Sequence, residues 1–138
     1  MILADTSVWI DFLEGGAHWT KERLKEKIQN RQSLIYTEMI LLEILQGIQS
    51  RKERKEIERK FGSLILASQH RSTTLLAADI YQELRRKGIT IRSIVDCLIA
   101  ATAIETGASI LHKDRDFDRI AEFYPIVIEK EQSQQGGI

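Results

Sequence analysis

Helix and strand signals follow each other directly in Ser93-Ile-Val-Asp-Cys-Leu-Ile-Ala-Ala-Thr-Ala-Ile-Glu-Thr-Gly107-Ala-Ser-Ile-Leu-His112, the stretch that decides the fold class. The residues up to the glycine predict a helix, because helical spacing places Asp96, Ala100 and Ala103 on one face. Small residues on that face favour close packing against a sheet. The apolar residues of 109–112 then predict a short strand.

The same alternation of short apolar runs and helical patterns extends through the rest of the chain. Strands are predicted at 2–4, 34–36, 109–112 and 126–128, whereas 64–67 is too short to assign. Helices are predicted over 8–14, 18–30, 38–46, 51–61, 73–87, 93–106 and 117–123. Short apolar strands separated by helices are typical of a parallel sheet covered on both faces. We therefore expect an α/β fold, a three-layer α/β/α sandwich with a short-stranded, mainly parallel sheet.

The composition is that of a globular protein. Of the 138 residues, 43% are hydrophobic and 29% are charged, and 20 Lys and Arg balance 20 Asp and Glu. This composition argues against extensive disorder and against nucleic-acid binding driven by bulk charge. A membrane span is not expected, because no apolar run approaches the roughly 18 residues it requires. We expect one domain over 1–128, followed by a flexible, frayed polar tail over 129–138.

The expected location is the cytoplasm. The apolar start of the chain is interrupted by Asp5 and is not preceded by basic residues, so no secretory signal is predicted. The single cysteine, Cys97, cannot form an internal disulfide, and we expect it to be a buried helix thiol. The fold therefore does not depend on an oxidising compartment.

Acidic side chains follow two of the predicted strands. Asp5 comes directly after the strand at 2–4, and Asp114 comes two residues after His112. In a parallel sheet these positions lie at the same edge, where open α/β sheets bind their ligands. An aspartate at such a junction also commonly caps the following helix. The sequence leaves both roles open.

Two further acids, Glu43 and Asp96, interrupt otherwise apolar helices. Every other residue of Met39–Leu45 is apolar, which predicts a helix buried on almost all sides, and a buried carboxylate needs a partner or a metal ion. A glutamate on a narrow exposed edge is the alternative. Asp96 begins the small-residue face of its helix, where interaction with the helix dipole is the alternative to a site role.

Four acids gathered at one sheet edge repel one another unless protons or cations neutralise them. An oxygen-only set without a His or Cys pattern favours Mg²⁺ or Mn²⁺ over Zn²⁺. Asp116 is a further candidate for this set, whereas Asp118 is expected to support the start of a helix. The run 114–118 also looks like the start of an EF-hand loop, but Arg119 and Pro125 stand where that loop requires Gly and Glu.

Four segments, taken in order, resemble the PIN-domain nucleases and, within them, the VapC toxins of bacterial and archaeal toxin–antitoxin pairs. The segments are Ile2–Ile10 (ILADTSVWI), Thr37–Gly47 (TEMILLEILQG), Asp96–Gly107 (DCLIAATAIETG) and His112–Phe117 (HKDRDF). The resemblance runs through most of the chain, from residue 2 to about residue 128.

The resemblance implies a PIN-like fold and a Mg²⁺-dependent endoribonuclease, with Mn²⁺ as the other candidate ion. Asp5, Glu43 and Asp96 correspond to the first three acids of a metal-binding quartet, and the fourth is either Asp114 or Asp116. By this resemblance Asp5 and Asp96 hold the ion most directly. Glu43 orients the attacking water or binds a second ion, and cleavage leaves a 5′-phosphate.

The resemblance also implies partners: an RNA substrate, a small cognate antitoxin, and a second copy of the chain in a homodimer that forms a larger hetero-oligomer with the antitoxin. The family often has Thr or Ser where this chain has His112, so Thr6 or Ser7 is expected to supply a hydroxyl near the site. His112 itself is expected to pack beside the acids or support them.

Other functions remain open. One is a PIN-type RNA-processing or DNA nuclease outside a toxin–antitoxin pair, and another is a protein that binds without catalysis. A receiver-like Mg²⁺-binding regulatory module and a phosphatase of the haloacid-dehalogenase type fit less well. Each requires a second acid close to the first, where this chain has Thr6 and Ser7.

Basic residues offer candidate RNA contacts. The segment 51–60 mixes both signs of charge, which is typical of a solvated helix face, although it could instead guide an RNA backbone. Arg92 lies one helical turn before Asp96, so it is expected either to contact RNA or to pair with that aspartate.

Overall fold

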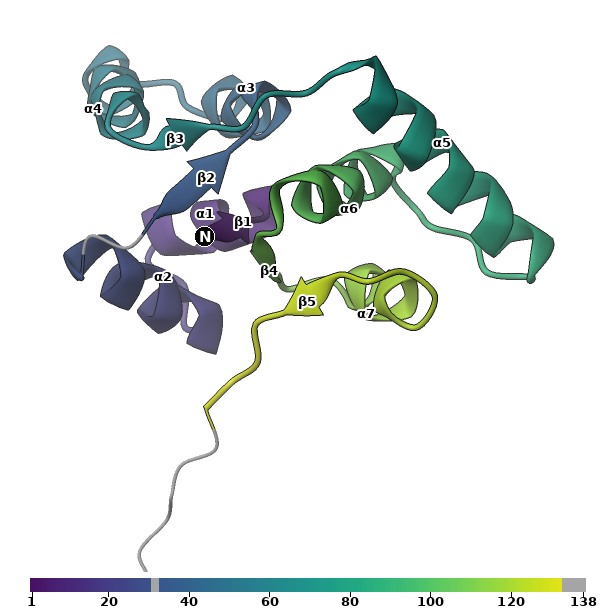
Figure 1. Ribbon diagram of the computed structural model, residues 1–138. Coiled ribbons are helices and arrows are strands. Elements are labelled where there is room, and N and C mark those ends of the chain that lie inside the picture. The colour runs from purple at the N-terminus through teal and green to yellow at the C-terminus, as the bar shows by residue number, and fades with distance from the viewer. Residues whose placement is uncertain (31–32, 133–138) are drawn as a thin grey trace, which may run out of the picture.

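The computed structural model describes residues 1–30 and 33–132 and contains one sheet surrounded by helices (Figure 1). The strands are β1 (Ile2–Ala4), β2 (Leu34–Tyr36), β3 (Ile65–Leu66), β4 (Ser109–Leu111) and β5 (Val127–Ile128). The helices are α1 (Thr6–Leu13), α2 (Trp19–Gln29), α3 (Glu38–Gln46), α4 (Arg51–Gly62), α5 (Arg71–Arg86), α6 (Ile94–Thr106) and α7 (Arg115–Ala121). In these two ranges no helix combines the length and apolar character needed to cross a membrane.

The sheet is parallel throughout, with the strand order β3-β2-β1-β4-β5. Leu3 of the central strand is aligned with Ile35 of β2 on one side and Ile110 of β4 on the other. Every residue of β1 and β2 is buried, as expected for inner strands covered on both faces. The segment that was too short to assign from sequence forms the exposed edge strand β3.

Helices cover both faces of the sheet, which confirms the predicted three-layer sandwich (Figure 1). α1 contacts α2 and α3, whereas α6 contacts α5 and α7. This grouping is the one that right-handed crossovers produce for the observed strand order. The connection from β1 leads to one side of the sheet and that from β4 to the other, so the carboxyl ends of these two strands form the switch point where α/β sheets bind ligands.

Aromatic rings fill the core beneath α1 and α4. The Trp9 ring centroid lies 4.7 Å from that of Phe61, which in turn lies 4.9 Å from that of Tyr36. Ile57 and Phe61 are the buried residues of α4. The charged residues of 51–60 therefore face solvent, as the mixed charge pattern predicts.

Helix α6, predicted over 93–106, forms as predicted. The Ser93 hydroxyl accepts a hydrogen bond from the Val95 backbone N–H at 3.2 Å, and Gly107 ends the helix with a φ of 74°. Ala100 and Ala103 are buried. Local capping signals therefore set both ends of this helix.

Replacing Gly107 with alanine is expected to lower the free energy of unfolding by about 1 kcal/mol, because a Cβ is unfavourable in the left-handed region. Denaturant unfolding measures the change. Gly62→Ala is the matched control, since a Cβ there meets no atom within 4 Å. Equal losses of stability in the two variants would contradict the conformational explanation.

α3 corrects one prediction. The apolar helix over Met39–Leu45 is not buried on almost all sides: Ile40 and Ile44 are buried, but Met39 and Leu42 are 36% and 58% exposed. The reason is its place in the outer layer, where it contacts α1 and α4 and leaves its far side uncovered. The apolar residues of α3 therefore form an exposed surface on one side of the helix and part of the core on the other.

Three helices, α1, α5 and α7, begin two residues earlier than predicted, and side-chain hydrogen bonds close the starts of the last two. The Thr73 hydroxyl accepts a hydrogen bond from the His70 backbone N–H at 2.9 Å, and α5 begins at Arg71. Asp114 accepts from the Asp116 backbone N–H at 3.0 Å, and α7 begins at Arg115.

The start of the predicted tail is anchored to the fold. The Glu129 backbone N–H donates to the Ile110 carbonyl at 2.8 Å, and the Glu129 carboxylate pairs with Arg23 at 2.9 Å. Arg23 also donates to the Lys130 carbonyl at 2.9 Å. The part of the predicted tail at 133–138 lies outside the described residues.

Candidate metal centre

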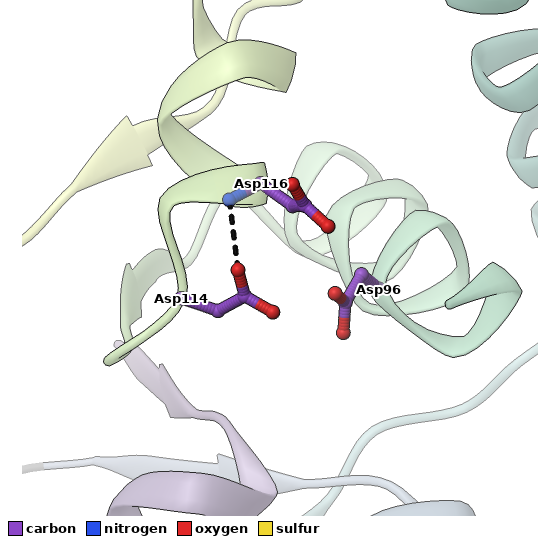
Figure 2. Close-up of side chains that lie close together, drawn as sticks. All are labelled: Asp96, Asp114 and Asp116. Atoms are coloured by element: carbon purple, nitrogen blue, oxygen red, sulfur yellow. Dashed lines mark hydrogen bonds between the residues drawn. The ribbon is translucent and has the colours of Figure 1, made fainter. Parts of the chain in front are cut away.

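Three aspartates meet beyond the end of β4 (Figure 2). A carboxylate oxygen of each of Asp96, Asp114 and Asp116 lies within 4.8 Å of the other two. Asp96 belongs to the first turn of α6, Asp114 is the N-cap of α7, and Asp116 lies in the first turn of α7. The structure therefore brings together three of the five predicted site residues, including both candidates for the fourth acid.

Asp114 combines capping with a place in this acidic group. Its Oδ1 atom accepts the Asp116 backbone N–H, so the capping alternative is confirmed. Figure 2 shows its other carboxylate oxygen directed toward Asp96. Burial raises the pKa of Asp114, but the Asp116 N–H and the Arg92 guanidinium outweigh burial and hold this pKa below its ordinary value.

Asp96 has the most strongly altered carboxyl of the group. Burial raises the pKa of Asp96 to about 8, and the neighbouring carboxylates add to the rise, that of Asp5 first. The side chain therefore holds a proton near neutral pH unless a cation replaces it. Such an altered pKa within a cluster of like charges is typical of functional sites.

Arg92 neutralises the cluster from its solvent side. Its Nη2 atom lies 2.9 Å from Asp114 Oδ1, and its Nε atom lies 3.3 Å from Asp116 Oδ2. Pairing of Arg92 with Asp96, one of its two expected roles, is wrong, because its guanidinium pairs with Asp114 and Asp116 instead. Its side chain remains 68% exposed. The RNA contact suggested for Arg92 stays a prediction.

Asp5 lies beside the three aspartates, at the end of β1. It is buried at the N-cap position of α1, and its Oδ2 atom accepts a hydrogen bond from the Ser7 hydroxyl at 2.8 Å. Burial raises the pKa of Asp5, and the charge of Asp114 contributes to the rise. Asp5 is therefore electrostatically coupled to the cluster, although it is not one of the three closest acids.

Glu43 is connected to this region through a hydroxyl. Thr6, the neighbour of Asp5, donates from Oγ1 to Glu43 Oε1 at 3.0 Å. Glu43 is half-buried on α3, so it is neither a fully buried carboxylate nor a fully exposed one. Thr6 and Ser7 thus each donate a hydroxyl hydrogen bond to a predicted site acid, as expected, and Glu43 stands outside the close group of three.

The donor set fits a hard divalent cation. Three carboxylates offer only oxygen ligands, which suits Mg²⁺ and Mn²⁺. Ligands about 2.1 Å from an octahedral Mg²⁺ lie about 3.0 Å apart when adjacent and about 4.2 Å apart when opposite, so oxygens that lie within 4.8 Å of one another would each draw closer by at most about 2 Å. The proton on Asp96 and the ion pairs of Arg92 supply the neutralising charge that a bound cation would replace.

Two neighbours of the site match their predicted roles. Cys97 is a buried thiol, and burial raises its pKa to about 12, which leaves it unreactive. The His112 ring packs beside the acids, with its centroid 5.1 Å from that of Phe117. Sequence reasoning missed its hydrogen bond to the acidic segment, which the Asp114 backbone N–H donates to His112 Nδ1. The available signal was a histidine two residues before an acid at a strand end.

Comparison with known proteins gives the family. The PIN domain family model matches residues 2–123. The chain belongs to the PIN-domain family. This PIN-domain protein is 37% identical over 123 residues to Ribonuclease VapC11 of Mycobacterium tuberculosis strain H37Rv, covering 88% of the chain and 92% of the relative. VapC ribonuclease Mb1587 of Mycobacterium bovis matches with the same values. The protein therefore belongs with the VapC group of PIN domains, as the four segments indicated.

Solved structures agree on the fold of this PIN-domain protein. VapBC2 from Rickettsia felis, bound to a DNA fragment from its promoter, matches with a TM-score of 0.73 and 19% identity over 94% of this chain and 98% of that one. VapBC-1 from nontypeable Haemophilus influenzae matches with a TM-score of 0.72 and 19% identity, over 94% and 97% of the two chains. At these identities the likeness concerns the fold alone.

Proposed function

We propose that this PIN-domain protein is a metal-dependent endoribonuclease and the toxin of a toxin–antitoxin pair, with residues 1–128 as one nuclease domain. The observation that carries the proposal is the close group of Asp96, Asp114 and Asp116, which a cation would allow to ionise fully. The similarity to proteins named as VapC ribonucleases supports RNA as the substrate.

The proposed ion is Mg²⁺, with Mn²⁺ as the alternative. Asp96, Asp114 and Asp116 would hold it, and Asp5, which is electrostatically coupled to them, would complete the acidic shell. A bound ion supplies Lewis-acid polarisation of the phosphodiester and activation of water. Asp96 must first release its proton, so binding is coupled to deprotonation at this carboxyl.

Glu43 has a separate proposed role, because it stands apart from the three closest acids. Held by the Thr6 hydroxyl at 3.0 Å, its carboxylate would orient the attacking water or take part in binding a second ion. In-line attack on phosphorus then breaks the bond to the 3′ oxygen and leaves a 5′-phosphate.

Cleavage of RNA by the purified protein tests this function. Structured and unstructured RNAs are incubated with Mg²⁺, with Mn²⁺ and with a chelator, and the product ends are mapped. Divalent-ion-dependent cuts bearing 5′-phosphates would support the proposal, whereas cleavage of single-stranded DNA in preference to RNA would favour a DNA nuclease. Failure to cut RNA with either ion would refute it.

A groove between α1, α3 and α4 is the proposed binding surface for the antitoxin. It encloses about 970 Å³ and is lined by apolar and acidic side chains, among them Leu13, Ile48, Glu43 and Glu56. Its glutamates outnumber its basic residues, so the fitting occupant is an antitoxin segment with an apolar face and basic side chains. Several of the matched structures are toxin–antitoxin complexes, which supports a partner of this kind.

Leu13→Glu is expected to weaken binding of the cognate antitoxin at least tenfold, because it puts a further carboxylate at an apolar position of an acidic groove. Co-purification with the small protein encoded next to this one identifies the antitoxin, and calorimetry measures its affinity. Phe123→Glu is the control, another exposed apolar position, which lies outside the groove. Equal effects of the two substitutions would contradict this placement.

Homodimerisation and a cytoplasmic location complete the proposal. The exposed apolar side chains of α3 and α5, Met39, Leu42 and Leu75, support a self-association surface. Light scattering of the purified protein measures the oligomeric state. A monomer at all concentrations would contradict the dimer and leave the nuclease proposal in place.

A further inference from the structure

His112 follows β4 directly and sits beneath the loop that carries Asp114 and Asp116. It is only 9% exposed, although it is a polar residue at the edge of the sheet. One face of its ring packs against Phe117, with the ring centroids 5.1 Å apart. The ring is therefore fixed in orientation by packing as well as by hydrogen bonds.

The two ring nitrogens have different partners, and these determine the tautomer. The Asp114 backbone N–H donates to Nδ1 at 3.0 Å, so Nδ1 must carry a lone pair. The ring proton then resides on Nε2, which lies 3.2 Å from Asp118 Oδ1 and donates to it. A neutral imidazole with this single tautomer satisfies both contacts.

The contact at Nδ1 is the first of two successive hydrogen bonds in which a side chain accepts the backbone N–H two residues further on. Asp114 Oδ1 accepts the Asp116 backbone N–H at 3.0 Å, just as His112 Nδ1 accepts the Asp114 backbone N–H. In each case a side-chain acceptor holds the N–H two residues further on, the pattern by which Asn, Asp, Ser and Thr fix turns. His112 thus sets the backbone from which both acids project.

From this geometry we propose that His112 is a positioning residue of the metal centre, whose Nδ1 atom pre-organises Asp114 and Asp116 for binding a divalent cation. The inference rests on the proposed function, since it concerns the same site. Partners that orient metal ligands typically change metal affinity by about 10–100-fold when removed. His112 would not touch the ion or the RNA.

The chain contains its own control for a merely structural effect. At the start of α2, His18 Nδ1 accepts the Thr20 backbone N–H at 3.3 Å. This is the same type of hydrogen bond, in a turn that carries none of the five predicted site acids. Loss of a turn acceptor at His18 and at His112 should affect folding in similar ways. An effect on metal binding should appear at His112 alone.

The test compares His112→Leu, which fills the buried position with an apolar side chain and removes the acceptor, with His112→Asn, whose side-chain oxygen can accept the same N–H. Mg²⁺ and Mn²⁺ affinities are measured by calorimetry on the RNA-free protein, and thermal unfolding is followed without metal. We expect His112→Leu to weaken metal binding by about 10–100-fold. His112→Asn should stay within about threefold of the parent, and His18→Leu should bind metal normally.

Two results would overturn the role of His112. One is unchanged metal affinity in His112→Leu, and the other is a loss in His112→Asn as large as that in His112→Leu, which would assign the effect to ring packing or to the Asp118 contact. These outcomes are distinct from failure of the proposed function. If the unmodified protein binds neither Mg²⁺ nor Mn²⁺, the metal centre itself is refuted, and the role of His112 with it.

Discussion

Asp96→Asn is expected to reduce RNA cleavage at least about 100-fold while leaving the fold intact. Asparagine has nearly the same shape as aspartate but cannot ionise, so it removes a charged ligand from the three closest acids. Loss of several kcal/mol of charge stabilisation in the transition state corresponds to a rate loss of this size. Initial cleavage rates of the variant and the parent at saturating Mg²⁺ give the comparison.

Asp79→Asn is the matched control for this experiment. It makes the same chemical change at an exposed position of α5, away from the cluster. Its cleavage rate should equal that of the parent, and circular dichroism should show both variants folded. Undiminished Mg²⁺-dependent cleavage by Asp96→Asn would remove Asp96 from the proposed site.

The metal-free protein is expected to lose stability as the pH rises from about 4 to about 8. The pKa of Asp96 is about 8 in the folded protein against an ordinary value of 3.8, so the folded state binds this proton more tightly than the unfolded state. A raised carboxyl pKa therefore favours folding at low pH, and this contribution is lost between the two pKa values. Burial raises the pKa of Asp5 as well, which acts in the same direction.

Asp114 acts in the opposite direction, but in a different pH range. Its pKa is lowered, so its contribution to stability is present above its ordinary pKa of 3.8 and is lost only on further acidification. Between pH 5 and pH 8 the change should therefore follow Asp96, with a magnitude on the order of a few kcal/mol. Urea unfolding at a series of pH values, in the presence of a chelator, measures this dependence.

Asp96→Asn isolates the contribution of Asp96 to the pH dependence of stability. Without metal, Asp96→Asn should be more stable than the parent at pH 8 and similar to it near pH 4, because the variant carries no carboxyl to ionise. Mg²⁺ should stabilise the parent at pH 8 and have little effect on the variant. If the free energies of unfolding of the two proteins show the same pH dependence without metal, ionisation of Asp96 does not cause the loss of stability.

The site was predictable from sequence to the extent that it depends on chain order. Asp5 and Asp114 follow parallel strands, so the sequence alone indicated that they share one edge of the sheet. Asp96 was identified because a carboxylate at the start of a small-residue helix face lacks a simple packing explanation. The sequence did not separate Asp114 from Asp116, because both fit the pattern, and in the structure both join the cluster.

Local physical chemistry explains why so many elements could be predicted. Ser93 and Gly107 set the ends of α6 through a hydrogen bond and a backbone angle that involve only near neighbours. Thr37 likewise caps α3, where its hydroxyl accepts the Ile40 backbone N–H at 3.2 Å. Signals of this kind act within one helical turn, so they can be recognised in the sequence.

Tertiary structure alone decided the features that depend on distant partners. The apolar sequence of α3 contains no information about which of its sides a neighbour covers, and Leu42 is left exposed. Arg92 was expected either to contact RNA or to pair with Asp96, but its carboxylate partners, Asp114 and Asp116, come from the start of α7. The alternation of helices and strands thus determined the layers of the fold and the edge of the sheet at which the acidic residues lie. The distances among those acids, and the charges that neutralise them, arise only when separate segments pack together, because electrostatic energies depend on burial and spacing that chain order does not specify.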